Sequence, residues 1–302
     1  MMTPRSFLFV PGDSERKMAK AASSAANALV LDLEDSVAAE KLAAARQTVR
    51  EFLLAQRDRT RQQLWVRINP LDTDKALDDL AQVMAGAPDG VLIPKCLGGT
   101  DIERLGHYLD ALERREGLPA DATRIVAVAT ETSAAMFGLG SYRASSARLA
   151  GLTWGAEDLA TAVGASTNKA EDGSYSFVFQ LARNLCLLGA KAAGVHAIDS
   201  VLPSFRDTEA LRAEVRRARL DGFTAKFAIH PDQVEAINAG FRPDEREIAH
   251  ARAVVAAFQQ APNAGTLQVD GRMVDKPHLT QALQILEAAG VDAQSQHSGA
   301  AA

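Results

Sequence analysis

The chain has 302 residues, of which 47% are hydrophobic and 24% are charged, as expected of a globular protein with one large α/β domain or two small ones. Its formal net charge of −5, with no block of basic residues, argues against nucleic acid as a partner. No apolar run reaches the length of a membrane span and the first residues lack a signal-peptide pattern, so we expect a cytoplasmic protein with no membrane partner.

Eight short apolar runs recur along the chain and predict buried strands. Most are continuously apolar and β-branched, which is typical of strands covered on both faces. They span residues 6–10, 28–33, 63–68, 90–94, 124–130, 149–154, 196–201 and 225–229. Helical stretches lie between them at the spacing of βα units. This alternation predicts a (β/α)8 TIM barrel over residues 1–240, with a doubly wound open sheet as the alternative.

The connection between the sixth and seventh runs is longer than the others. Its extra segment, residues 165–180, is mostly polar and includes a glycine. Such an insertion is expected in a loop, and the long loops of a barrel usually surround the active site.

The residues after the eighth run predict an α/β extension over 241–292. An amphipathic helix comes first, a hairpin with Asp270 and Gly271 at its turn follows, and a last helix ends the segment. We expect this block to pack on the barrel or on a neighbouring subunit, and residues 293–302 to form a disordered tail. Cys96 and Cys186 each lie in an apolar run, which indicates buried thiols and not a disulfide scaffold.

Polar residues follow most of the predicted strands. In a barrel the C-terminal ends of the strands face one shared pocket, so these side chains are expected to converge. In chain order they are Asp32, Glu34, Asp35, Arg67, Asn69, Lys95, Glu131, Glu157, Asp158 and His230. A structural alternative exists for several: Asp35 and Asp158 can cap the helices that follow, and Arg67 and Lys95 can neutralise the acids.

Glu131 and Asp158 form the best candidate for a metal site. They follow consecutive strands, and two protein carboxylates with water and substrate oxygens are the usual ligands of Mg²⁺. Neither segment contains His or Cys, which argues against zinc. Glu157 competes for this role, although a helix that starts near Ala156 would turn it away from Asp158.

Two further groups of cations are candidates for substrate binding. The planar guanidinium of Arg67 suits a substrate carboxylate. Arg16 and Lys17 follow a strand-to-helix turn, where a helix N-terminus and two cations can bind phosphates. The alternative at this turn is an ordinary helix capped by Asp13 or Ser14.

Seven segments together resemble the citrate lyase β-subunit-like family of the HpcH/HpaI aldolase/citrate lyase superfamily, which contains CoA-ester lyases such as citramalyl-CoA and malyl-CoA lyases. The resemblance covers residues 5 to about 290. The segments are RSFLFVPGDSERKMAKA, ALVLDLEDSVAAEKLAAAR, WVRINP, ATETSAAM, WGAEDLA, KFAIHPDQVEAIN and DGRMVDKP. In residues 165–180 the chain departs from the family pattern, which puts the identity of the substrate in doubt.

The resemblance implies a TIM barrel that binds Mg²⁺ and cleaves or forms a carbon–carbon bond beside a thioester. Glu131 and Asp158 match the metal-binding carboxylates, and Glu131 also contacts substrate. Arg67 matches the arginine that binds the substrate carboxylate. Arg16 and Lys17 fall where the family contacts the CoA phosphates. Asp275 matches an acid that a neighbouring subunit supplies, which implies a homotrimer or homohexamer.

The expected reaction is therefore the Mg²⁺-dependent cleavage of a 3-hydroxy-acyl-CoA, such as malyl-, citramalyl- or citryl-CoA, into an acyl-CoA and a 2-oxo acid. Arg67 and Asp275 are the expected catalytic residues, and Glu34, Asp35 and Lys95 are expected to orient them or the metal-bound water. Three alternatives stay open: a subunit that acts on acyl-carrier-protein thioesters, a class II pyruvate aldolase that needs no CoA, and a non-catalytic scaffold.

Overall fold

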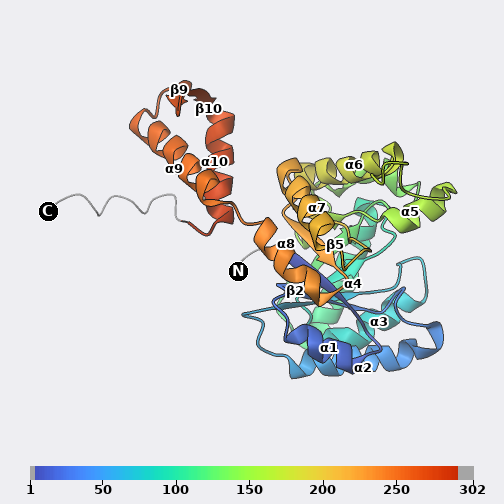
Figure 1. The fold of residues 1–302 in the computed structure, drawn as a ribbon. Coiled ribbons are helices and arrows are strands. Elements are labelled where there is room, and N and C mark those ends of the chain that lie inside the picture. The colour runs from blue at the N-terminus through green and yellow to red at the C-terminus, as the bar shows by residue number, and fades with distance from the viewer. Residues whose placement is uncertain (1–3, 292–302) are drawn as a thin grey trace. The chain divides into compact units, whose positions relative to one another are not determined.

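The eight predicted strands close into a parallel barrel in the computed structural model, which describes residues 4–291 (Figure 1). Each strand pairs with its neighbour in sequence, and β1 pairs with β8 to close the ring. The strands are β1 (Ser6–Pro11), β2 (Ala28–Asp32), β3 (Gln63–Arg67), β4 (Gly90–Ile93), β5 (Arg124–Val128), β6 (Leu149–Thr153), β7 (His196–Asp199) and β8 (Ala225–Ala228). The prediction of a (β/α)8 barrel is confirmed, and the open sheet was the wrong alternative.

Large apolar side chains fill the interior of the barrel. Phe7, Trp65, Val126, Ile198 and Phe227 belong to one buried cluster, and they come from five different strands of the barrel. The rings of Phe7 and Trp65 meet edge to face with their centroids 5.8 Å apart. Burial of each such side chain contributes about 1.5–3 kcal/mol relative to exposure. The barrel is therefore a packed core that fixes where its strand ends lie.

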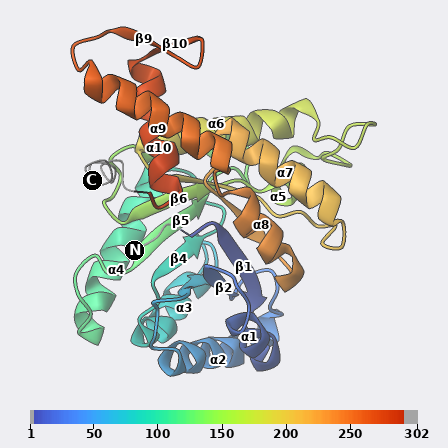
Figure 2. The same ribbon diagram turned by 60° about the vertical axis from the view of Figure 1, so that its left-hand side comes forward.

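Helices surround the barrel, and glycines end four of them. Figure 2 shows β4, β5 and β6 side by side, β1 beside β2, and helices α1, α2 and α4 outside these strands. The helices of the barrel are α1 (Glu15–Ala22), α2 (Leu42–Ala55), α3 (Lys75–Val83), α4 (Gly99–Glu116), α5 (Ala156–Val163), α6 (Phe177–Ala193), α7 (Thr208–Asp221) and α8 (Val234–Gly240). Gly117, Gly164, Gly194 and Gly222 end α4 to α7 in the left-handed conformation, which glycine adopts without steric cost.

A second compact unit begins at Ala239 and has a hydrophobic core of its own. Its elements are α9 (Glu245–Gln260), β9 (Thr266–Val269), β10 (Arg272–Asp275) and α10 (Lys276–Ala288). Strands β9 and β10 form an antiparallel hairpin, and Asp270 and Gly271 both have positive φ at its turn, as a two-residue hairpin loop requires. What this unit packs against stays a prediction, and the expected disordered tail, residues 293–302, lies outside the described residues.

Two further expectations concern the thiols and the membrane. Cys96 and Cys186 are both free and buried, as their apolar surroundings in the sequence predicted. Over residues 4–291, no helix combines the length and the apolar character that a membrane span needs.

Candidate active site

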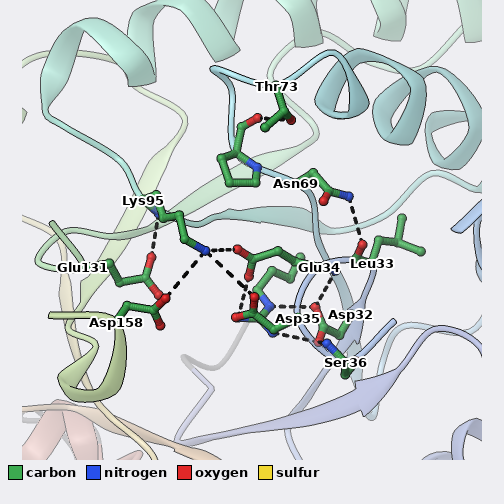
Figure 3. Close-up of polar contacts among 12 residues, drawn as sticks. Asp32, Leu33, Glu34, Asp35, Ser36, Asn69, Thr73, Lys95, Glu131 and Asp158 are labelled. Atoms are coloured by element: carbon green, nitrogen blue, oxygen red, sulfur yellow. Dashed lines mark hydrogen bonds and ion pairs between the residues drawn. The ribbon is translucent and has the colours of Figure 1, made fainter. Parts of the chain in front are cut away.

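The carboxylates of Glu131 and Asp158 lie beside each other at the C-terminal end of the barrel (Figure 3). Glu131 follows β5 and is only 5% exposed, and Asp158 lies in the first turn of α5. Glu131 Oε2 accepts a hydrogen bond of 2.6 Å from the backbone N–H of Lys95. The backbone of Lys95 is in the left-handed region with φ 51°, which is uncommon for a residue with a side chain. Strained backbone of this kind is concentrated at functional sites.

The electrostatics of Glu131 favour a bound cation. Burial, and then the negative charges of Asp158 and Glu34, raise the pKa of Glu131 to about 8, although the N–H and the ammonium of Lys95 work in the other direction. A cation between Glu131 and Asp158 would remove their mutual repulsion and compensate for the lost hydration.

The donor set fits Mg²⁺. Mg²⁺ prefers hard oxygen ligands and usually takes only one or two protein carboxylates, with water and substrate completing its octahedron. Within residues 4–291, no group of three or more His, Cys, Asp or Glu side chains is placed to hold a metal. Two carboxylates would leave most of that octahedron to water and substrate oxygens.

Lys95 is the cation at the centre of this cluster (Figure 3). Its ammonium pairs with Glu34 and lies 3.9 Å from Asp35 Oδ1 and 3.7 Å from Asp158 Oδ1. Burial works against its charge, but the hydrogen bond and the charge of Glu34 outweigh burial and raise the pKa of Lys95. Lys95 is therefore a charged ion-pair partner, and not a neutral amine ready to form a Schiff base.

Arg67, at the end of β3, is held by protein carboxylates. Its Nε and Nη2 donate to the two oxygens of Asp32 at 2.6 and 2.7 Å, and its Nη1 lies 2.8 Å from Glu34 Oε2. Burial would raise the pKa of Asp32, but the hydrogen bonds and the charge of Arg67 lower it. The guanidinium fork therefore faces Asp32, and only Nη1 is directed toward the Glu34 side of the site.

Glu34 and Asp35 differ in their surroundings. Glu34 is buried, and burial raises its pKa even though Arg67 and Lys95 favour its charged form. Asp35 is more open, with its side chain 56% exposed, and lies 3.4 Å from Arg67 Nη1. The predicted grouping of Glu34, Asp35, Lys95 and Arg67 thus exists as a network of ion pairs beside the two metal candidates.

Glu157 points away from this network. Because α5 begins at Ala156, successive residues of its first turn face different directions. The carboxylate of Glu157 accepts a hydrogen bond of 2.8 Å from the side chain of Asn168. Asp158, and not Glu157, therefore has its carboxylate beside that of Glu131.

Arg16 and Lys17 lie outside the cluster, and Asp275 lies in the second unit of the chain. Arg16 and Lys17 are exposed on α1, where Ser14 is the N-cap residue but its side chain makes no capping hydrogen bond. Asp13 pairs with Lys41 at 3.5 Å, so neither expected side-chain cap is formed. Asp275 belongs to the second unit, where its Oδ1 lies 2.5 Å from His278 Nδ1. Its place beside a barrel site stays a prediction.

His230 lies at the turn after β8, and its contacts shape that turn. Its ring stacks on Phe205 with the centroids 4.7 Å apart, and its Nδ1 accepts a hydrogen bond from the backbone N–H of Asp232. Together with Gln233 it forms a capping box at the turn after β8.

Sequence reasoning missed a buried network of charged side chains around Asp199, at the end of β7. The carboxylate of Asp199 at the end of β7 accepts hydrogen bonds from Trp154, Arg183 and Lys226 at 2.8, 3.1 and 3.2 Å. Lys226 is only 2% exposed. A lysine inside the apolar run AKFAI was the signal, because a buried lysine almost always requires an acidic partner.

A closed parallel barrel with acids and bases gathered at the C-terminal ends of its strands has the architecture of TIM-barrel enzymes, whose active sites lie at that end. Residues 5–231 match the HpcH/HpaI aldolase/citrate lyase family. The chain belongs to this family.

Relatives and solved structures agree with this assignment. A (3S)-malyl-CoA thioesterase of Cereibacter sphaeroides is 34% identical over 93% of each chain, and a citrate lyase subunit beta of Leuconostoc mesenteroides is 30% identical over 95% of this chain and 94% of its own. The structure of CitE from Mycobacterium tuberculosis in complex with magnesium, acetoacetate and coenzyme A is 34% identical and has a TM-score of 0.77. That match covers 95% of this chain and 98% of the other.

Proposed function

We propose that the protein is a Mg²⁺-dependent carbon–carbon lyase that cleaves or forms a 3-hydroxy-acyl-CoA thioester, such as malyl-, citramalyl- or citryl-CoA. The observation that carries the proposal is the buried Glu131 carboxylate beside Asp158, at the barrel end where a cation is needed. The magnesium and coenzyme A in the CitE complex from Mycobacterium tuberculosis support it.

Each residue of the site has a distinct part in this reaction. Glu131 and Asp158 would hold the metal, which when bound would supply Lewis acidity to the substrate and favour loss of its hydroxyl proton. The N–H of Lys95 fixes Glu131 in place. Arg67 contributes positive charge toward the departing 2-oxo acid. In the synthetic direction the ionised Asp275 of a neighbouring subunit removes a proton from the acyl-CoA carbon, and in the cleavage direction its protonated form returns that proton to the enolate carbon.

The CoA part of the substrate is assigned to the exposed cations of α1. Arg16 and Lys17 lie in the first turn of a helix, where backbone N–H groups and the helix dipole also favour phosphate. A homotrimer or homohexamer follows from the assignment of Asp275 to a neighbouring site.

A second candidate function is hydrolysis of the thioester. It is favoured by the likeness to a (3S)-malyl-CoA thioesterase. The two reactions give different products: a lyase yields a 2-oxo acid and an acyl-CoA, whereas a thioesterase yields a hydroxy acid and the free thiol of CoA. The products therefore separate the two.

The test is an assay of EDTA-treated protein on malyl-, citramalyl- and citryl-CoA, with and without Mg²⁺. We expect one 2-oxo acid to form without an equal amount of free thiol, and we expect the activity to disappear with EDTA and in Asp158→Ala. A matched control is Glu103→Gln, an exposed carboxylate on α4, which should keep wild-type activity.

The other outcomes decide against the proposal. Free thiol without a 2-oxo acid would establish the thioesterase. Full activity in Asp158→Ala would overturn the metal assignment. If no CoA ester reacts, assays with an acyl-carrier-protein thioester and with free hydroxy-oxo acids test the carrier-protein subunit and the CoA-free aldolase.

A further inference from the structure

The polar insertion between α5 and α6 folds into a small hairpin, residues 168–176, which we call the α5–α6 hairpin. Lys169 and Tyr175 form an antiparallel bridge. The backbone N–H of Ser176 donates to the carbonyl of Asn168 at 3.0 Å and closes the base. The residues at the tip bond among themselves. The insertion is thus a defined element, although the sequence predicted only a loop.

Two side chains at the base of the α5–α6 hairpin contact the segment between β6 and α5. The amide of Asn168 is 8% exposed and donates to the carboxylate of Glu157 at 2.8 Å. The ring of Tyr175 meets Trp154 edge to face, with centroids 5.0 Å apart and planes at 76°. Hydrogen bonds to charged groups and aromatic pairs are among the stronger single contacts in proteins.

Trp154 also contacts a buried network of charged residues around Asp199. Its indole N–H donates to Asp199 Oδ1 at 2.8 Å, and Asp199 is fixed in turn by Arg183 and Lys226. Asp199 is 3% exposed, so its charge needs these partners. A movement of Trp154 would therefore break its hydrogen bond to Asp199 and its ring contact with Tyr175.

The segment held in this way is the one that positions both metal candidates. The residue after Trp154 is Gly155, whose N–H donates to Thr130 Oγ1 at 3.2 Å. A Cβ at Gly155 would lie 2.8 Å from Glu131 Cγ, so the backbone there packs directly against Glu131. Asp158 follows Glu157 in the first turn of α5.

We propose that the α5–α6 hairpin is a strut for the metal site, in which Asn168 and Tyr175 are positioning residues that hold segment 154–158 and thereby Asp158 and Glu131. This inference rests on the proposed function, because it assigns the metal to these two carboxylates. The hairpin acts through Glu157 and Trp154, and neither Asn168 nor Tyr175 is itself a metal ligand.

The test measures metal binding directly, by titration calorimetry with Mg²⁺ and by electron paramagnetic resonance with Mn²⁺ on EDTA-treated protein. Asn168→Ala and Tyr175→Ala should each bind the metal about tenfold more weakly, as is usual when a group that orients a ligand is lost. Tyr175→Phe keeps the ring and should bind as the wild type does. Ser174→Ala, at the tip of the hairpin, is the matched control and should also bind normally.

A double-mutant cycle isolates the hydrogen bond between Asn168 and Glu157. Glu157→Ala should weaken metal binding as Asn168→Ala does, and the double variant should be no weaker than either single one, because both remove the same contact. Additive losses would show that the two residues act separately and would overturn this part of the strut.

The controls separate failure of the inference from failure of the proposed function. Wild-type protein that binds neither Mg²⁺ nor Mn²⁺ would overturn the metal site itself. Wild-type protein that binds metal, with Asn168→Ala and Tyr175→Ala that bind equally well, would overturn the strut alone. The melting temperature of each variant without metal shows whether the barrel has stayed folded.

Discussion

At the scale of single residues, the properties of the site depend on Glu131. It is almost fully buried, it accepts a hydrogen bond from the backbone N–H of Lys95, and it lies near two other carboxylates. A carboxylate in this position is either protonated or neutralised by a cation. Lys95 supplies one positive charge, but its ammonium pairs with Glu34. The site therefore has more negative charge than its own lysine balances, which is the condition for divalent cation binding.

This imbalance predicts a pH dependence of stability in the metal-free protein. Burial raises the pKa of Glu131 from its usual 4.5 to about 8. Between these two values the folded protein keeps a proton that the unfolded chain has released, so the free energy of unfolding falls as pH rises. The slope from this one group is at most about 1.4 kcal/mol per pH unit.

Glu131→Gln should remove that slope, because glutamine does not ionise. Thermal melts in EDTA at about pH 5.5 and about pH 8 should show a smaller loss of stability in Glu131→Gln than in the wild type. Glu103→Gln, exposed on α4, should melt with the wild-type pH dependence. Equal slopes in Glu131→Gln and the wild type would show that Glu131 is already ionised in the metal-free fold.

At the scale of elements, the junction of β6 and α5 brings the two metal candidates together. β6 ends at Thr153 and α5 begins at Ala156, so few residues separate the strand from the helix that carries Asp158. Gly155 lies in this junction with extended backbone, and its lack of a side chain is what gives Glu131 its room. The glycine is therefore required by close approach and not by backbone conformation.

Gly155→Ala should disturb the metal site more than the fold. Its Cβ would lie 2.8 Å from Glu131 Cγ, and a side chain can move where backbone cannot. We expect a loss of stability below about 1.5 kcal/mol, together with metal affinity about tenfold lower because Glu131 is displaced. Gly140→Ala is the matched control, since nothing lies within 4 Å of its added Cβ. Unchanged metal affinity in Gly155→Ala, measured by calorimetry, would contradict this account of the junction.

The strands and the two metal candidates could be predicted from the sequence because both rest on local patterns. Continuous apolar runs mark strands covered on both faces, and Glu131 and Asp158 lie just after two of them. The partners of Arg67 could not be predicted in the same way. Its fork suggested a substrate carboxylate, but its bidentate partner is Asp32, and that choice depends on the register of β2 and β3.

Contacts between segments that are distant in the chain could not be predicted from the sequence either. Asn168 and Tyr175 lie in a polar stretch whose composition predicts a loop, and nothing local indicates that their partners are Glu157 and Trp154. The left-handed backbone of Lys95 is likewise set by the fold around it, because lysine has no preference for that conformation.

At the scale of the whole molecule, the separate core of the second unit bears on how Asp275 reaches a site. Apolar side chains from α9, α10, β9 and β10 pack together, so the unit is stabilised by its own core. This packing fixes the backbone position of Asp275 within the unit. Asp275 lies at the start of α10, where the hydrogen bond from His278 lowers its pKa and keeps it ionised. An ionised carboxylate is the form that removes a proton in the synthetic direction.

Subunit mixing tests whether Asp275 acts on a neighbouring barrel. Asp158→Ala has an intact Asp275 and a defective metal site, whereas Asp275→Asn has the reverse, so each variant alone should be inactive. If the acid is supplied between subunits, denaturing and refolding the two together in equal amounts should restore about a quarter of wild-type activity, since half of the barrels and half of the extensions are intact. If each chain used its own Asp275, every site would carry one defect and the mixture would stay inactive. Light scattering on the wild type checks the trimer or hexamer, and a monomer with full activity would refute the exchange of Asp275 outright.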